Sequence, residues 1–252
     1  MRTIAYFLFV FLPFIVGCSS MYIPSPKPTP LFASKGEAQV EIGTSINSPF
    51  ITGGYAFSEK YALIASGSLS YRNFMNVYER PYVEFDILPF PDGAFAHRAV
   101  ELGIGRYDML SSSRHKMELF AGVAYGNANE DKVRNSYYQC FLQANTGNRN
   151  KHFEIGGAFR LAFSWFDYLG PAYYPTGYRR EDMHQKFGAA HIEPLFFMKF
   201  GGENLKGSFR AGGNLALPFN FSNSYVDDWY NRSGFWEYTI FHLSLGLSYR
   251  FR

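Results

Sequence analysis

The chain has 252 residues, of which 19% are aromatic, and its formal net charge at pH 7 is +3. This near balance of charge argues against a nucleic-acid-binding protein, which would need a clustered basic excess. The mean hydropathy of −0.17 excludes a bundle of apolar helices. Abundant aromatic residues with modest hydropathy are typical of strands that are apolar on alternate residues only.

Residues 1–17 have the features of a secretory signal peptide. Arg2 precedes an apolar run, Ile4–Val16, that is too short for a stable transmembrane helix. The stretch ends in IVGC, which resembles the lipobox of bacterial lipoproteins and implies cleavage before Cys18, with a covalent lipid (palmitate) on that residue. Ser19 resembles a signal for sorting to the outer membrane. The alternative is an ordinary signal peptide that contains a cysteine. With Cys18 lipidated, Cys140 has no partner for a disulfide.

A proline-rich stretch follows the signal peptide. Four prolines lie between Pro24 and Pro30, and they exclude a helix or a central strand. Residues 18–35 are therefore predicted to form an extended, lipidated tether that leads to a single domain at residues 36–252.

The rest of the chain alternates between apolar and polar residues with a period of two, which is typical of β-strands. Val100, Leu102 and Ile104, for example, share one face of a predicted strand. The pattern predicts ten strands, at about 36–46, 50–57, 61–71, 97–106, 116–126, 136–146, 152–164, 187–200, 205–217 and 235–251. Most reach the roughly 9–11 residues that a tilted strand needs to cross a membrane.

The predicted connections have unequal lengths. Those after the second, fourth, sixth and eighth strands are short, and those after the third, fifth, seventh and ninth are long. Short periplasmic turns and long outer loops are typical of outer-membrane barrels. An even number of strands then places the N- and C-termini on the periplasmic side.

We therefore predict an all-β fold, a transmembrane antiparallel up-and-down β-barrel of ten strands, with eight or twelve strands as alternatives. The barrel must close, because the backbone groups of an open sheet edge have no partner in hydrocarbon. A soluble β-sandwich would show the same alternation. The predicted outward face carries almost no charge, however, and aromatic residues gather near the strand ends, as in the girdles of membrane barrels.

Six stretches carry a family resemblance: YIPSPKPTPLFASKGEAQVEIGT, GGYAFSEKYALIASGSLS, ELGIGRY, ELFAGVAYGN, CFLQANTG and HIEPLFFMKFGGENLKGSFRAGGN. Together they resemble a Bacteroidota family of outer-membrane β-barrel lipoproteins of unknown function. The resemblance implies the barrel and brings no catalytic residue. The last strand also resembles the signal recognised by the barrel-assembly machinery, although Arg252 ends the chain where an aromatic is usual. The matching positions are Ser244, Gly246, Tyr249 and Phe251.

The predicted inward face holds charged side chains. A ten-stranded barrel encloses little space, and its acids and bases are nearly matched, which favours a structural network that fills the lumen over a porin. The candidate members are Glu193, Arg210, His191, Glu154, Arg160, Glu101 and Glu118. Glu193 is expected diagonal to Arg210 across a hairpin, within reach of an ion pair. The alternatives are a ligand or ion site at Glu193, Arg210 and His191, or a narrow channel for a small solute.

The predicted outer loops are rich in aromatic residues, which could bind sugars or a partner. The candidates are Trp165, Tyr173, Tyr174, Tyr178, Trp229 and Trp236. The alternative is that these residues form the upper aromatic girdle and cap the barrel mouth.

Catalysis is not the expected role. Outer-membrane proteases of the omptin type use acidic residues and a histidine at the outer rim, and this chain has Asp182, His184, Asp227 and Asp228 in predicted outer loops. No matching motif surrounds them, so an outer-rim hydrolase is kept only as an alternative. No set of His, Asp or Glu residues has the spacing of a metal site, and no cofactor is expected.

The expected function is that of an outer-membrane lipoprotein with a structural or surface-interaction role in the cell envelope of a Gram-negative bacterium. Its expected partners are outer-membrane lipid, the barrel-assembly and lipoprotein-sorting machineries and an unidentified envelope protein, with no nucleic acid.

Overall fold

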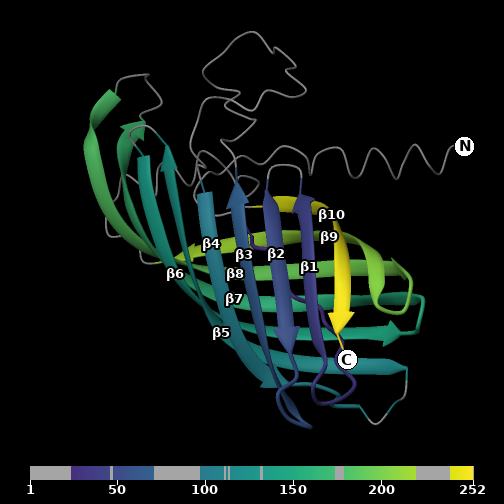
Figure 1. Cartoon of the computed structure of the whole chain (residues 1–252). Helices are drawn as coiled ribbons and strands as arrows, with labels where there is room; N and C mark the ends of the chain where they lie inside the picture. Colours follow the sequence, from purple (N-terminus) through teal and green to yellow (C-terminus); the bar gives the residue numbers. More distant parts are fainter. Residues whose placement is uncertain are drawn as a thin grey trace, which may run out of the picture.

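Ten antiparallel strands close into a barrel (Figure 1). The computed structural model describes residues 24–45, 48–70, 97–110, 112, 114–130, 133–173, 179–219 and 239–251. The strands are β1 (Ala38–Ser45), β2 (Pro49–Tyr55), β3 (Tyr61–Ser70), β4 (His97–Arg106), β5 (His115–Glu130), β6 (Val133–Arg149), β7 (Phe153–Tyr173), β8 (Arg179–Gly201), β9 (Leu205–Phe219) and β10 (Thr239–Phe251).

Each strand pairs with its neighbours in sequence, and β1 pairs with both β2 and β10. At this seam Val40 lies opposite Tyr249, and Gly43 lies opposite Gly246. The prediction of a ten-stranded, closed, antiparallel barrel is confirmed. Among the described residues, no helix is long and apolar enough to span a membrane.

The two ends of the barrel differ in their connections. One end, here called the short-turn end, holds the connections 56–60, 150–152 and 202–204, the start of β1 and the end of β10. The opposite end, here called the long-loop end, holds the connections 71–96 and 220–238. The predicted long loops after the fifth and seventh strands are wrong, because β5 and β6 are separated only by residues 131–132 and β7 and β8 only by residues 174–178.

The missing loop residues belong to strands that are longer than predicted and extend beyond their neighbours (Figure 1). The reason is a change in the outward face. Tyr125, Tyr138 and Trp165 face outward at paired positions and are 40%, 66% and 52% exposed. Two residues further along, Asp167 pairs with Lys186 across β7 and β8, and both are exposed. The apolar alternation on the outward face therefore ends at Tyr125, Tyr138 and Trp165, here called the aromatic ring of the wall. The backbone pairing of the strands continues beyond these residues.

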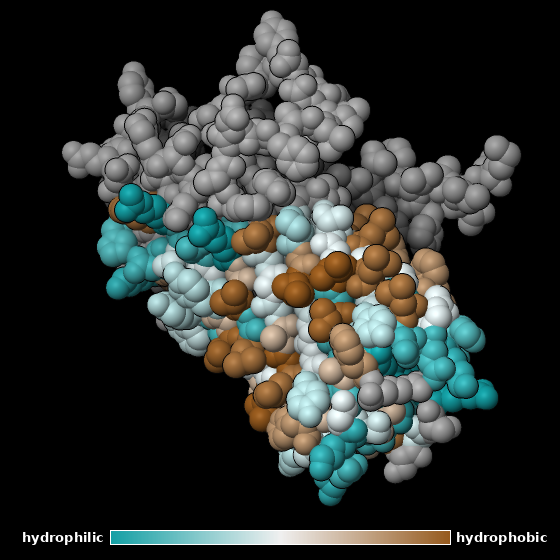
Figure 2. Space-filling view, in the orientation of Figure 1, coloured by the Kyte–Doolittle hydropathy of each residue, from teal (hydrophilic) through white to brown (hydrophobic). Residues whose placement is uncertain are grey.

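The outward face below this ring is apolar. Figure 2 shows brown side chains gathered in a band over the strands, with teal side chains beyond it. Outward residues more than half exposed include Ile42, Val100, Leu102, Ile104, Val123, Leu245 and Leu247. Such a continuous apolar surface is unfavourable in water and is typical of the lipid-facing band of a membrane barrel.

The inward face is packed with polar and charged side chains. Among the described residues, those buried include six glutamates and seven lysines and arginines. Apolar clusters flank them: one contains Phe32, Ile64, Tyr107, Phe120 and Phe141. The wall is therefore amphipathic in the sense opposite to a soluble domain, with its charges inside.

Candidate functional site

The lumen is occupied by the chain's own N-terminal segment. Every residue from Pro24 to Phe32 is buried, although none of them belongs to a strand. We call Pro24–Phe32 the lumenal segment. The predicted tether is corrected in one respect: this part of it lies inside the barrel, where the wall supplies polar partners. Cys18, the predicted site of lipidation, lies outside the described residues.

Five successive carbonyl oxygens of the lumenal segment accept hydrogen bonds from side chains of the wall. The donors are Arg210 to Lys27 (2.8 Å), Gln143 and Asn145 to Pro28 (2.8 and 3.2 Å), Lys199 to Thr29 (2.5 Å), Arg250 to Pro30 (2.7 Å) and Arg149 to Leu31 (2.8 Å). Four of these six donors are charged, and charge-assisted hydrogen bonds are the stronger kind. The segment is therefore held along its length.

The prolines of the lumenal segment match this donor-rich wall. Proline has no backbone N–H, and Pro24, Pro26, Pro28 and Pro30 occupy every second position. A buried N–H without an acceptor is costly, and the arginine, lysine and amide side chains beside the segment mainly donate. The alternating prolines thus reduce the number of buried backbone N–H groups, for which these side chains provide few acceptors.

Two side chains fix the register of the lumenal segment. Lys27 Nζ lies 2.9 Å from Glu193 Oε2, and both side chains are buried. At the other end, the Phe32 ring packs edge-on against Tyr107, with the ring centroids 5.8 Å apart. A Cβ atom on Gly54 would lie 2.9 Å from the Phe32 ring, so only glycine leaves room for it.

Leu31 has a left-handed backbone conformation, with φ of 51°. This conformation costs a non-glycine residue roughly 1–2 kcal/mol and persists only where the surroundings impose it. Arg149 holds the Leu31 carbonyl, and the fully buried Leu31 side chain lies over Gly147, where a Cβ would approach it to 3.0 Å. The bend at Leu31 directs the chain out of the lumen to the exposed residues 33–36.

Glu37 ties this exit to the wall. Its carboxylate accepts hydrogen bonds from the Arg149 guanidinium and, at 2.8 Å, from the Ala33 N–H. Burial opposes the ionisation of Glu37, but the hydrogen bonds and charge of Arg149 outweigh it and lower the pKa of this carboxyl. The start of β1 is therefore fixed relative to the lumenal segment.

The order of contacts gives the direction of the lumenal segment. Phe32 lies by Tyr107, which follows β4 at the short-turn end, and Leu31 is bound by Arg149, the last residue of β6 at that end. Lys27 instead contacts Glu193, well inside β8. Going back along the chain, the segment therefore rises from the short-turn end toward the long-loop end.

Ion pairs of the wall surround the lumenal segment. Glu154 has the richest environment: its carboxylate lies 2.7 Å from Lys206 Nζ, 3.1 Å from an Arg250 nitrogen and 3.9 Å from Lys199 Nζ. All four side chains are at most 6% exposed. Such a cluster compensates charges that would be very unfavourable alone in the membrane interior.

A second group of ion pairs lies across the lumen. Arg160 donates to both carboxylate oxygens of Glu101, at 2.8 and 3.0 Å, and also to Gln143. This bidentate geometry is the strong form of an arginine–carboxylate pair. Arg160 therefore joins β7 to β4 across the barrel.

All seven residues predicted for the lumen network are buried: Glu193, Arg210, His191, Glu154, Arg160, Glu101 and Glu118. The ion-pair partners found for two of them differ from the predicted diagonal pair. Arg210 binds Glu41 of β1 at 2.6 Å, and Glu193 binds Lys27 of the lumenal segment. The cation that pairs with Glu193 therefore belongs to the lumenal segment and not to a strand. Strand pairing alone could not have predicted this ion pair.

Glu118 and His191 have local roles in this arrangement. Glu118 accepts hydrogen bonds from the Phe32 N–H at 2.7 Å and from Asn145 at 2.9 Å, so it binds the lumenal segment directly. His191 Nδ1 lies 3.1 Å from Asn214 Oδ1 on the neighbouring strand. Within the described ranges, no group of three or more His, Cys, Asp and Glu residues is arranged to hold a metal ion.

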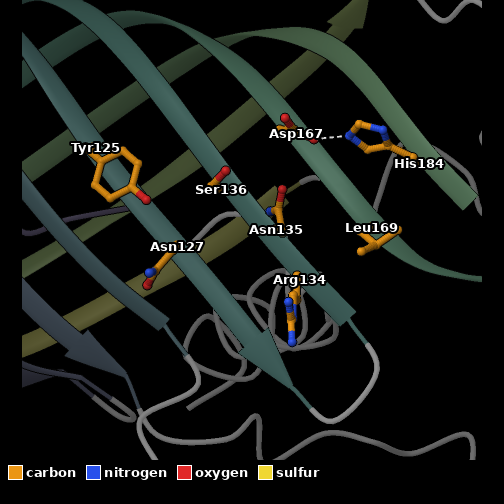
Figure 3. Close-up of a pocket in the computed structure, with 8 residues that line it drawn as sticks. All are labelled: Tyr125, Asn127, Arg134, Asn135, Ser136, Asp167, Leu169 and His184. Atoms are coloured by element: carbon orange, nitrogen blue, oxygen red, sulfur yellow. Dashed lines mark hydrogen bonds and ion pairs between the residues drawn. The ribbon is translucent and has the colours of Figure 1, made fainter. Parts of the chain in front are cut away.

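A second candidate site is a pocket of about 420 Å³ on β5–β8 above the aromatic ring (Figure 3). Asp167 and His184 point toward each other from neighbouring strands, with Oδ1 and Nε2 2.5 Å apart. Asp167 and His184 are 48% and 58% exposed and lie on the outward face, so this pair does not belong to the lumen. The pocket is lined by polar side chains together with Tyr125 and Leu169, and it lies beyond the apolar band.

Most of the other rim residues singled out in the sequence lie outside the described residues. Of the loop aromatics, Trp165 faces outward in the aromatic ring of β5–β7. Tyr173 ends β7, whereas the remaining aromatic candidates lie outside the described residues: Tyr174, Tyr178, Trp229 and Trp236. Among the hydrolase candidates, Asp182 pairs with Pro171 in the ladder of β7 and β8, and Asp227 and Asp228 lie outside the described residues.

The predicted assembly-signal residues lie at the seam of the barrel. Ser244 and Gly246 face the lumen, and Tyr249 and Phe251 face outward, 42% and 51% exposed, with ring centroids 4.7 Å apart. Together they present an aromatic pair at the short-turn end.

No family model and no curated protein matches the chain. Among solved structures, it is similar to the outer membrane protease OmpT from Escherichia coli, with 11% identity, a TM-score of 0.44 and coverage of 85% of this chain and 93% of that one. It is also similar to Ail, the attachment invasion locus protein of Yersinia pestis, with 9% identity, a TM-score of 0.35 and coverage of 86% and 100%. The chain is a closed ten-stranded antiparallel β-barrel with an apolar outward band and a buried salt-bridge network inside.

Proposed function

We propose that this protein is a lipoprotein of the Gram-negative outer membrane, lipidated on Cys18, whose barrel is closed by its own N-terminal segment. Its role is structural or interactive at the cell surface, with no catalytic step and no cofactor. The observation that carries the proposal is the occupied lumen, in which the wall binds five successive carbonyls of the lumenal segment. The resemblance of IVGC to a lipobox supports the lipid, and the family resemblance supports the placement in the envelope.

Charge balance supports a closed barrel over a selective channel. A selective pore presents rings of one sign and leaves ions a path. Here five of the six buried glutamates that the structure describes form ion pairs with lysines or arginines, as in the cluster around Glu154. The lumenal segment then occupies the space between the walls.

The purified protein is therefore expected to give no discrete conductance steps in a planar lipid bilayer. A variant that lacks residues 24–32 is the matched comparison, and it is expected to conduct wherever its heat-modifiable gel mobility shows a folded barrel. Discrete conductance of the full chain at the same protein concentration would contradict closure and favour the narrow channel.

The direction of the lumenal segment suggests that Pro24 faces the outer side of the membrane. Long loops of outer-membrane barrels lie outside the cell and short turns in the periplasm, and the segment rises toward the long-loop end. A hexahistidine tag inserted directly before Pro24 is therefore expected to be labelled by antibody on intact cells. The same tag inserted after Lys35, in the exposed connection to β1, is expected to be labelled only after the outer membrane is permeabilised. The reverse pattern would restore the predicted periplasmic N-terminus.

A further inference from the structure

We propose that the lumen is a binding site for an extended, proline-rich peptide, and that it accepts such a peptide as a separate molecule. In this chain the resident ligand is the lumenal segment. The proposal rests on the same occupied lumen as the proposed function, but it adds that the occupant is held by non-covalent recognition and can be exchanged.

The wall recognises the peptide backbone. Donors from β6, β8, β9 and β10 reach consecutive carbonyls between Lys27 and Leu31, so the peptide is bound from several sides of the barrel at once. Backbone carbonyls are present in every peptide, and a proline-rich extended chain makes no internal hydrogen bonds, so its carbonyls are free to accept bonds from the wall. Recognition of this kind demands an extended conformation more than a particular side chain at each position.

Proline at alternate positions makes such a ligand favourable. A proline-rich chain is already extended in solution, so little conformational entropy is lost when it binds. It also lacks the N–H groups that this donor-rich wall would leave without acceptors. The same two properties would hold for a peptide that is not joined to the barrel.

Side-chain selectivity is concentrated at two positions. Lys27 meets the buried carboxylate of Glu193 at 2.9 Å, and Phe32 fills the space beside Tyr107 and Gly54. Thr29 contributes only its carbonyl: its buried hydroxyl has no hydrogen-bond partner among the residues that the structure describes. The preferred ligand is therefore a proline-rich peptide with a cation followed, five residues later, by an aromatic residue.

The covalent link between ligand and barrel runs through an exposed stretch. Residues 33–36 are exposed, whereas Phe32 and Glu37 on either side are buried. A protease site inserted between Ser34 and Lys35 can therefore be cleaved after the full chain has folded, without disturbing the positive φ of Gly36. Unchanged heat-modifiable mobility after cleavage shows that the barrel is intact.

The test is exchange in this cleaved protein. Fluorescent synthetic peptides covering residues 24–34 are added in detergent, and binding is followed by fluorescence anisotropy. The native peptide is expected to bind with saturation, and the Lys27→Glu peptide at least about tenfold more weakly, because it places a second carboxylate against buried Glu193. The matched control is the Thr29→Val peptide, which is expected to bind within about twofold of the native one.

Two results would overturn the proposal. In the first, the cleaved barrel stays folded, keeps its own unlabelled lumenal segment and takes up no labelled peptide during the same period. The other is equal binding of the native and Lys27→Glu peptides, which would show adsorption without lumenal recognition. Either result leaves the closed lumen of the proposed function standing, because that proposal is tested by conductance of the uncleaved chain.

Discussion

Replacing Glu154 with glutamine is expected to lower the free energy of unfolding of the barrel by about 3 kcal/mol. Glu154 is the anion shared by Lys206, Arg250 and Lys199 in a nearly water-free setting. Removing one partner of a buried ion pair leaves uncompensated buried charge, which typically costs about 3–5 kcal/mol. The glutamine keeps the shape and one acceptor oxygen, so the low end of that range applies.

This effect is measurable by urea unfolding in lipid vesicles, followed by tryptophan fluorescence. The matched control is Glu59→Gln in the exposed connection between β2 and β3, where the same change of charge is screened by solvent and the unfolding curve is expected to stay close to that of the native protein. Similar unfolding midpoints for both variants would show that the cluster around Glu154 is not a stabilising feature.

Replacing Gly246 with aspartate is expected to prevent closure of the barrel. Gly246 faces the lumen opposite Gly43 at the seam between β1 and β10. A Cβ at this position would lie 2.8 Å from the Ile42 carbonyl oxygen and 3.3 Å from a Glu41 carboxylate oxygen. The aspartate therefore adds a steric clash with backbone and a like charge at the step that removes the last open sheet edge.

The expected readout for Gly246→Asp is loss of the heat-modifiable folded band from outer-membrane extracts. Gly202→Asp is the control, because Gly202 lies in the short connection between β8 and β9 and its nearest contact to an added Cβ is 3.4 Å. Folded protein at native levels in the Gly246→Asp strain would mean that the seam tolerates a larger residue than its geometry indicates.

Alternation was sufficient to predict the fold because each lipid-crossing strand must be apolar on one face. Residues such as Val100, Leu102 and Ile104 share one face of a predicted strand, and they lie outward in β4 as predicted. The criterion failed at Asp167 and Lys186, where the wall leaves the apolar band and the outward face becomes polar. There the strands remain paired because the backbone hydrogen bonds between them continue. Such bonds leave no apolar alternation in the sequence from which the pairing could be predicted.

The residues of the lumen network could also be predicted, but the position of the lumenal segment that they surround could not. Inward charges such as Glu154 and Arg160 follow directly from strand parity. The lumenal segment has no strand to give its position, and its prolines indicate only that it is extended. The available hint was the sequence after them: Leu31 and Phe32 are apolar residues that a tether in water would not need.

The lumenal segment also constrains the order of events when the barrel forms. Its bound carbonyls lie between walls formed by β6, β8, β9 and β10, and the ten described strands pair into a closed barrel, so a chain cannot pass sideways between them. Residues before β1 must therefore be in place before β10 joins β1, or be drawn through the cylinder lengthwise. In the first of these routes the first part of the chain is captured before the last part seals the barrel, so pairing of β10 with β1 encloses a segment that is already bound.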